Sequence, residues 1–128
     1  MTRRLLAVAM SAAALLPTTA EAAPGCVATA QRPTWQHNFG ATAAGSYTCD
    51  SPRALLGIEV CLESLGQTGF AAVMCETVEA GGVASLSAEA YGCRNGLWLI
   101  RTVTTGWSSA GDAGRAVSAP VPYFCTEL

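Results

Sequence analysis

The sequence predicts an all-β protein, a small antiparallel β-sandwich that is held together by three disulfides. Short apolar stretches, several of them alternating with polar residues, are separated by turn signals rich in Gly, Asn and Pro. This pattern is typical of antiparallel sandwiches. No stretch after residue 22 shows the period of 3.6 residues that marks an amphipathic helix. Six cysteines, an even number, lie in that same part of the chain, and in an exported protein they indicate a disulfide framework.

The N-terminus has the features of a cleaved signal peptide, which we assign to residues 1–22. Two arginines precede an apolar run over residues 5–16, and Ala20 and Ala22 occupy the −3 and −1 positions of an A-x-A cleavage site. The apolar run is shorter than the roughly 20 residues that a membrane-spanning helix needs. We therefore expect export, cleavage after Ala22, no membrane anchor after cleavage, and a single extracellular domain over residues 23–128.

Two other interpretations of this N-terminus stay open. Arg3 and Arg4 also occur in twin-arginine export signals, so the export route is not decided, although the rest of that motif is poor here. A lipid anchor on Cys26 is a weaker alternative, because Pro24 fits badly in a lipidation site and Cys26 lies far beyond the apolar run.

Composition excludes several classes of function. Residues 23–128 contain five arginines and no lysine against eight acidic residues, which gives a formal charge of −3. Nucleic-acid binding is not expected, because no basic patch is available to neutralise phosphates. The chain has no G-x-S-x-G motif, phosphate-binding loop or dinucleotide fingerprint, and His37 is its single histidine. We expect no catalytic residues, no enzyme activity and no cofactor.

The cysteines predict disulfides and not a metal site. No two of them form a C-x-x-C pair, and His37 has no cysteine near it in the sequence, whereas zinc sites bring ligands in close pairs. One pairing follows from local structure. Residues 55–63 and 70–78 read as two strands of a hairpin, and centring it on Thr68 places Cys61 opposite Cys75, within disulfide reach. The other face of this hairpin is expected to point to the core and carries Ile58, Leu62, Met74 and Val78.

The remaining four cysteines can pair in three ways. We favour Cys26–Cys49 and Cys93–Cys125, because a tyrosine stands two positions before the second cysteine of each pair. The recurrence of an aromatic residue at that position by chance is the alternative.

The strongest turn signal is Asn95-Gly96, a dipeptide that favours a type I′ turn because both central residues need positive φ. It predicts a hairpin of residues 86–93 and 97–104, with Cys93 opposite Trp98 and Tyr91 opposite Ile100. Elsewhere, we expect a strand over 27–31, a loop over 37–45, a flexible Gly/Ser/Ala-rich segment over 106–122 and a short edge strand over 123–125.

Candidate contact residues are aromatic. Trp107 adjoins the segment expected to be flexible, and loops held by a stiff scaffold often carry binding residues. Trp35 and His37 alternate with polar residues together with Phe39. This row is either exposed for stacking on a partner or turned into the core, and burial of Trp35 and Phe39 is the more ordinary interpretation.

Residues 93–102 read C-R-N-G-L-W-L-I-R-T. They resemble the C-x-x-G…R-T element of small secreted actinobacterial proteins that join a signal peptide to a cysteine-containing β-domain. The resemblance extends over about residues 47–125 and implies a fold but no activity.

We expect a secreted, non-enzymatic binding domain, an immunoglobulin-like sandwich in general appearance, that is monomeric and recognises an extracellular protein or a cell-wall component. A secreted protease inhibitor is the alternative, and it would present a rigid exposed loop near a disulfide. A small extracellular hydrolase is the least favoured, because no catalytic set is present.

Overall fold

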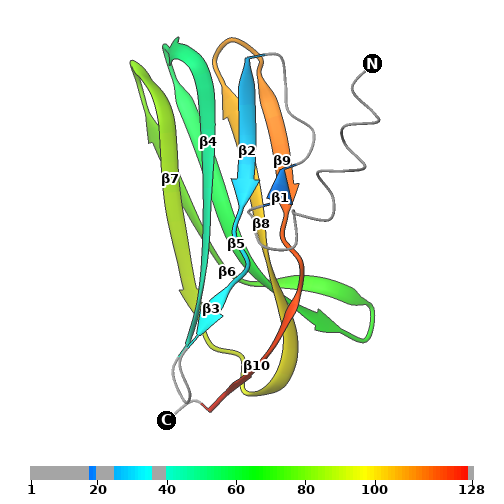
Figure 1. Ribbon diagram of the computed structural model, residues 1–128. Coiled ribbons are helices and arrows are strands. Elements are labelled where there is room, and N and C mark those ends of the chain that lie inside the picture. Colours follow the sequence, from blue (N-terminus) through cyan, green and yellow to red (C-terminus); the bar gives the residue numbers. More distant parts are fainter. Residues whose placement is uncertain (1–17, 20–24, 36–39, 127–128) are drawn as a thin grey trace, which may run out of the picture.

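The protein folds into two antiparallel β-sheets, as predicted (Figure 1). The computed structural model describes residues 18–19, 25–35 and 40–126, and these residues form strands and turns without a helix that could span a membrane. The first sheet contains β1 (Thr18–Thr19), β2 (Cys26–Ala30), β3 (Thr34–Trp35), β4 (Ala41–Arg53) and β7 (Val83–Gly92). The second sheet contains β5 (Leu56–Gly66), β6 (Gly69–Ala80), β8 (Gly96–Ser108), β9 (Ala113–Val117) and β10 (Val121–Cys125).

Each sheet is organised around long central strands. In the first sheet, β4 pairs with β7 on one side and with β2 and β3 on the other. In the second sheet, β8 pairs with β5 on one side and with β9 and β10 on the other, and β6 lies outside β5. The short strand β1 pairs with β2 and lies within the segment expected to be removed as a signal peptide.

The inner faces of the two sheets differ in side-chain size. The second sheet contributes branched aliphatic residues that are fully buried, namely Leu56, Ile58, Val60, Leu62 and Ile100. The first sheet contributes mainly alanines, at positions 28, 30, 41, 43, 88 and 90. Small residues facing large ones let the two layers approach closely. Gly106 illustrates this, because a Cβ atom there would overlap the buried ring of Tyr47 from the opposite sheet.

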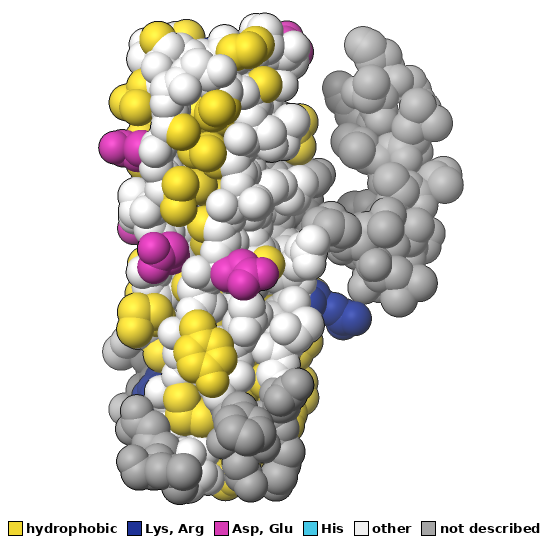
Figure 2. All heavy atoms as spheres, turned by 90° about the vertical axis from the view of Figure 1, so that its left-hand side faces the viewer, with side chains coloured by type: hydrophobic (Ala, Val, Ile, Leu, Met, Phe, Trp, Pro, Cys, Tyr) yellow, Lys and Arg dark blue, Asp and Glu magenta, His cyan; other side chains and the backbone are white. Residues whose placement is uncertain are grey.

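Strands β6 and β7 are the outer strands of their sheets on one side of the molecule. Figure 2 looks onto that side, where hydrophobic side chains gather and acidic side chains stand among them. The exposed glutamates on these strands are Glu76 and Glu79 of β6 and Glu89 of β7. Charged side chains on a sheet edge oppose pairing with the edge of another sheet.

The predicted β5–β6 hairpin is confirmed with its register. Cys61 is opposite Cys75 and Leu62 is opposite Met74, as the centring on Thr68 required. A β-bulge after Leu62 shifts the pairing by one residue toward the turn, and bulges bend a strand. The expectation that Met74 faces the core is wrong, because its side chain is 49% exposed on the edge strand.

All three predicted disulfides are present. Cys26–Cys49 joins β2 to β4 and Cys61–Cys75 joins β5 to β6, in both cases between directly opposed residues of one sheet. Their Cα atoms are 3.9 and 4.1 Å apart, a short separation like that of non-hydrogen-bonded antiparallel pairs. Cys93–Cys125 joins the crossover between β7 and β8 to the end of β10.

The predicted hairpin around Asn95-Gly96 is wrong. Gly96 does adopt a positive φ of 108°, so the local turn preference is real. However, residues 93–95 carry the chain from the first sheet to the second, and β7 pairs with β4 while β8 pairs with β5 and β10. Tyr91 is therefore opposite Thr42 and not opposite Ile100. Turn chemistry is local, whereas strand pairing depends on which faces of the whole chain can be buried together.

Two expected loops contain strands. The loop expected over 37–45 includes the start of β4 at Ala41, where small residues alternate between buried and half-buried positions. The segment 106–122, expected to be flexible, contains the end of β8 and all of β9. Its Gly/Ser/Ala composition hid the alternation, because Gly114 and Ala116 are buried on β9 beside exposed Arg115.

Candidate functional site

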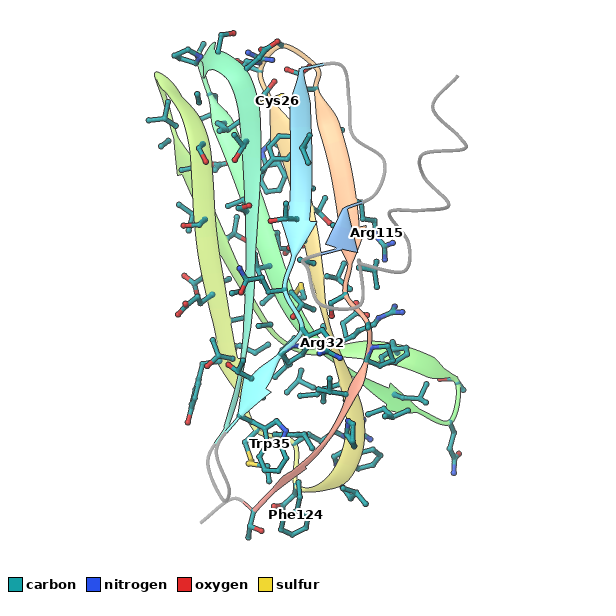
Figure 3. The ribbon with its side chains drawn as sticks, viewed as in Figure 1. Cys26, Arg32, Trp35, Arg115 and Phe124 are labelled. Carbon is teal, nitrogen blue, oxygen red and sulfur yellow. A yellow bond between two sulfur atoms is a disulfide. The ribbon has the colours of Figure 1, made fainter. Side chains whose placement is uncertain are left out.

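The two ends of the sandwich have different surfaces. Figure 3 shows Cys26 at one end and Trp35 and Phe124 at the other. We call the end with Cys26 the closed end, because its charged groups pair with one another. We call the other end the apolar end, and it is formed by β3, β10, the start of β8 and the tip of the β5–β6 hairpin.

A row of apolar side chains crosses the outer face of the second sheet at the apolar end. Even-numbered residues of β8 such as Ile100 are buried, so odd-numbered ones face outward. Cross-strand pairing then brings the outward residues together, with Leu97 opposite Phe124, Leu99 opposite Pro122 and Leu65 opposite Phe70. We call this set the apolar row: Leu65, Phe70, Leu97, Leu99, Pro122 and Phe124.

The apolar row is unusually exposed for its composition. The relative exposure of Leu97 is 71%, that of Leu99 and Phe124 is 39%, and that of Leu65 is 37%. Single exposed apolar residues are ordinary, but adjoining ones indicate an interaction surface. Leu97, Leu99, Pro122 and Phe124 are presented by the paired strands β8 and β10, and Leu65 and Phe70 by the last paired positions before the β5–β6 turn.

An ion pair borders the apolar row. The Arg101 Nε–H donates to Glu63 Oε1 over 2.9 Å, and the Arg101 guanidinium carbon lies 3.9 Å from the centre of the Phe70 ring. This cation–π contact holds Phe70 beside the sheet. The arginine charge is thus already balanced by a carboxylate of the same chain.

A second arginine, Arg94, is held in the angle between the hairpin tip and the β7–β8 crossover. Its guanidinium carbon lies 3.4 Å from the centre of the Trp98 ring, and its Nη1–H donates to the Ser64 hydroxyl over 2.6 Å. Its backbone N–H donates to the Tyr123 hydroxyl over 2.8 Å. The Trp98 Nε1–H in turn donates to the carbonyl of Asn95 over 2.6 Å. Both the arginine and its aromatic support are therefore fixed in place.

Two shallow hollows have Arg94 in their linings. One hollow is lined by Ser64, Ala71, Ala72, Val73, Cys93, Arg94 and Asn95. The other is lined by Leu65, Gly66, Gln67, Thr68, Arg94 and Trp98. Arg94 supplies the charge of both linings, and the other polar groups are hydroxyls and amides. Leu65 belongs to both the second hollow and the apolar row, so the two surfaces meet at the tip of the β5–β6 hairpin.

Trp35, on β3 of the first sheet, contacts β10 of the second sheet at the apolar end. Its Nε1–H donates to the carbonyl of Pro122 over 3.2 Å, and its ring meets that of Tyr123 edge-on at a centroid distance of 5.8 Å. The side chain is 36% exposed, so Trp35 partly packs and partly faces solvent. Together with the Cys93–Cys125 bond, it restrains β10 beneath the apolar row.

The closed end carries a compact charge cluster. Arg53 Nε lies 2.7 Å from Asp112 Oδ2, and the two side chains are only 13% and 16% exposed. Asp112 also accepts from the Ser108 hydroxyl over 2.9 Å. Hydrogen bonds from Arg53 and then from Ser108 hold the pKa of Asp112 below its ordinary value. Burial, followed by the nearby charge of Asp112, raises the pKa of Tyr47.

The described residues offer no metal-binding set that could act while the disulfides are intact. The groups of neighbouring sulfur and carboxylate atoms are Cys26, Cys49 and Asp112, and Glu59, Cys61 and Cys75. Each group contains both sulfurs of a disulfide, which are not thiolates, and the thiolate is the form that binds metals.

The structure separates the predicted contact residues. The expectation that Trp107 lies in a flexible segment is wrong, because it lies on β8 opposite Gly57. Gly57 has no side chain, and this leaves room for the indole. Trp107 is half-buried and precedes Ser108, which belongs to the charge cluster of the closed end, whereas Trp35 lies at the apolar end (Figure 3). His37 and Phe39 lie outside the described residues. The interpretation that Trp35 is simply buried in the core is also incomplete, since it keeps about a third of its surface exposed.

Sequence reasoning missed the apolar row and the stacked arginine. Alternation along residues 97–101 and the pair 122–124 carried the signal, because it shows which side chains share a face. The shared face becomes visible only when β8 is known to pair with β10. The Asn95-Gly96 dipeptide instead predicted a hairpin that pairs β8 with β7. Neither a scan against protein-family models nor a search of curated proteins finds a match to this chain.

Proposed function

We propose that this chain is a secreted, non-enzymatic binding domain that contacts an extracellular protein or a cell-wall component with the apolar row. The observation that carries the proposal is the set of neighbouring exposed side chains Leu97, Leu99, Phe124 and Leu65 on a sheet surface. Sheet faces exposed to water are ordinarily polar. Leaving such residues exposed favours a partner that covers them.

Secretion is supported by two independent features. The N-terminus has the order of a signal peptide, with basic residues, an apolar run and the cleavage residues before Ala23. Three disulfides occur in the described residues, and disulfides persist mainly in oxidising compartments.

The test is capture of a partner from spent culture medium and cell-wall material by the purified domain and by variants. The double variant Leu97→Ser and Leu99→Ser should weaken capture at least about tenfold, because fully burying a leucine side chain contributes about 1.5–3 kcal/mol. Its thermal unfolding midpoint should stay close to that of the parent, since both side chains are exposed.

Leu55→Ser is the matched control. Leu55 is 39% exposed, like Leu99, but it contacts Ser109 in the β8–β9 connection at the closed end. Capture should be unchanged in this variant. Equal capture by the parent and the Leu97/Leu99 double variant would remove the apolar row from the proposal.

One observation favours a protease inhibitor as a second candidate. The β5–β6 hairpin turns away from the body of the sandwich at its lower end (Figure 1), and the Cys61–Cys75 bond braces it. A rigid projecting segment is what an inhibitor presents to a protease. Residual activity of a panel of serine and cysteine proteases, measured with excess domain, separates the two candidates, since a binding domain of the first kind leaves every protease active.

A further inference from the structure

We propose that Arg94 binds a carboxylate of the partner, and that the partner segment therefore combines an acidic residue with apolar neighbours. This inference rests on the proposed binding function and specifies the chemistry of the partner. It concerns the hollow beside the apolar row that is lined by Leu65, Gly66, Gln67, Thr68, Arg94 and Trp98, which we call the Arg94 hollow.

The first argument is that the Arg94 guanidinium is already in position. Its central carbon lies over the Trp98 ring, 3.4 Å from the ring centre, and Nη1 donates to the Ser64 hydroxyl. Ser64 is itself 1% exposed on the inner face of β5, so this anchor is rigid. An arginine held in this way loses little side-chain freedom when a ligand binds, and less of the binding energy is then spent on ordering it.

The second argument is charge. In the part of the chain that the structure describes, the ion pairs involve Arg53 with Asp50 and Asp112, and Arg101 with Glu63. Arg94 has no carboxylate within 4.0 Å among these residues, although it is not fully exposed. Its hydrogen bonds to described side chains use Nη1, which leaves Nε and Nη2 as the two parallel donors that match a carboxylate.

The third argument is the lining of the hollow. Gln67 and Thr68, at the hairpin turn, supply neutral hydrogen-bonding groups, and one arginine supplies one positive charge. A single carboxylate matches this set better than a polyanion, which is usually bound by several cations. Leu65 and the Trp98 ring are the apolar parts of this lining, so an acidic side chain in the hollow places neighbouring apolar residues of the partner against these two side chains.

The experiment titrates the intact mature domain with two blocked peptides while the Trp98 indole N–H is followed by NMR. The probes are acetyl-Leu-Glu-Leu-Glu-Leu-amide and the same peptide with glutamine in place of glutamate. The glutamate peptide should shift the indole signal and bind at least about tenfold more tightly, because a charge-assisted bidentate pair is stronger than a neutral one.

Three variants make the result specific. Arg94→Gln should remove the difference between the two peptides, and Arg94→Lys should retain only part of it, because an ammonium lacks the planar fork. Arg115→Gln is the matched control, since Arg115 is an exposed arginine on β9 of the same sheet (Figure 3), and it should keep the full preference. Thermal unfolding of each variant shows whether it is folded.

Every other outcome counts against the proposal. Equal binding of both peptides, or equal loss in the Arg94→Gln and Arg115→Gln variants, would show that no carboxylate site exists at Arg94. A uronic-acid oligosaccharide that binds through Arg94 when the peptides do not would replace the acidic protein segment with a glycan. If the Leu97/Leu99 double variant loses partner capture while Arg94→Gln retains it, the proposed function stands and this inference fails.

Discussion

The two ends of the sandwich use arginine in opposite ways. At the closed end, Arg53 is inserted between Asp112 and Asp50 and also donates to the carbonyl and hydroxyl of Ser51. At the apolar end, Arg94 lies on an indole and donates to a serine hydroxyl, without a carboxylate among the described residues. Arg53 is therefore balanced by carboxylates of the same chain, as Arg101 is by Glu63, whereas Arg94 has no such partner among the described residues.

The two ends also differ in how much apolar surface they expose to solvent. Trp107, toward the closed end, is accommodated over Gly57 and is half-buried, whereas the apolar row leaves Leu97 and Phe124 in solvent. Under the proposed function, we expect the closed end to contribute mainly to stability and the apolar end to contact the partner. The predictions below separate these two roles, beginning with the largest expected effect.

Removal of a disulfide should have the largest effect. The double variant Cys93→Ser and Cys125→Ser should lower the free energy of unfolding by about 2–5 kcal/mol, as is typical of small secreted domains, and it should also weaken partner capture, because the bond restrains β10 under the apolar row. Urea unfolding and the capture assay measure the two effects.

The corresponding variant of the Cys26–Cys49 bond should lose a similar amount of stability, since both bonds close loops of comparable length with sequence separations of 23 and 32. Partner capture by the fraction that remains folded should be unaffected. If both variants lose capture equally, the two ends are not functionally distinct.

A smaller loss of stability is expected from Gly106→Ala. The added Cβ would overlap the ring of Tyr47, which is fully buried between the sheets, and overpacking of this kind typically costs about 1–3 kcal/mol. Gly66→Ala is the matched control, because the nearest atom to a Cβ there, the carbonyl oxygen of Gly69, is at an ordinary 3.6 Å. Thermal unfolding should show a lower midpoint for the first variant and little change for the second.

The smallest expected effect depends on pH. Because the pKa of Asp112 is held below its ordinary value by Arg53 and Ser108, its contribution to stability is present above the pKa of the unfolded chain, about 3.9. That contribution is lost as the pH falls through the lower pKa of the folded state. Asp112→Asn should therefore lower stability at pH 7 and flatten the decline of the unfolding midpoint below about pH 4.

Asp50→Asn is the control for this experiment. Asp50 also faces Arg53, but its Oδ1 lies 3.4 Å from Arg53 Nη2 and its side chain is 70% exposed. Its pairing with Arg53 therefore contributes little to the free energy of unfolding. A pH profile that changes as much for Asp50→Asn as for Asp112→Asn would show that the short Arg53–Asp112 contact is not the source of the acid sensitivity.

The disulfides show how far local reasoning reaches. Alternation in residues 55–63 and the turn before Phe70 fix a register, and the register brings Cys61 to Cys75. The bulge after Leu62 could not be predicted, because it depends on how the hairpin bends past the other sheet. Buried and exposed residues also alternate on β9, but its buried residues are Gly114 and Ala116, which do not stand out as core residues in the sequence. Their burial follows from the pairing of β9 with β8.

The sequence by itself determined the β-class, the two-residue periodicity of the strands and the Cys61–Cys75 pairing, because side-chain alternation and turn preference act over a few neighbouring residues. Tertiary structure alone decided that β7 and β8 separate into different sheets despite the Asn95-Gly96 signal. It also decided that Leu97 and Leu99 share one surface with Pro122 and Phe124, which lie more than 20 residues further along the chain. The physical reason is that strand pairing is selected by burial of whole faces, and burial depends on contacts between distant segments.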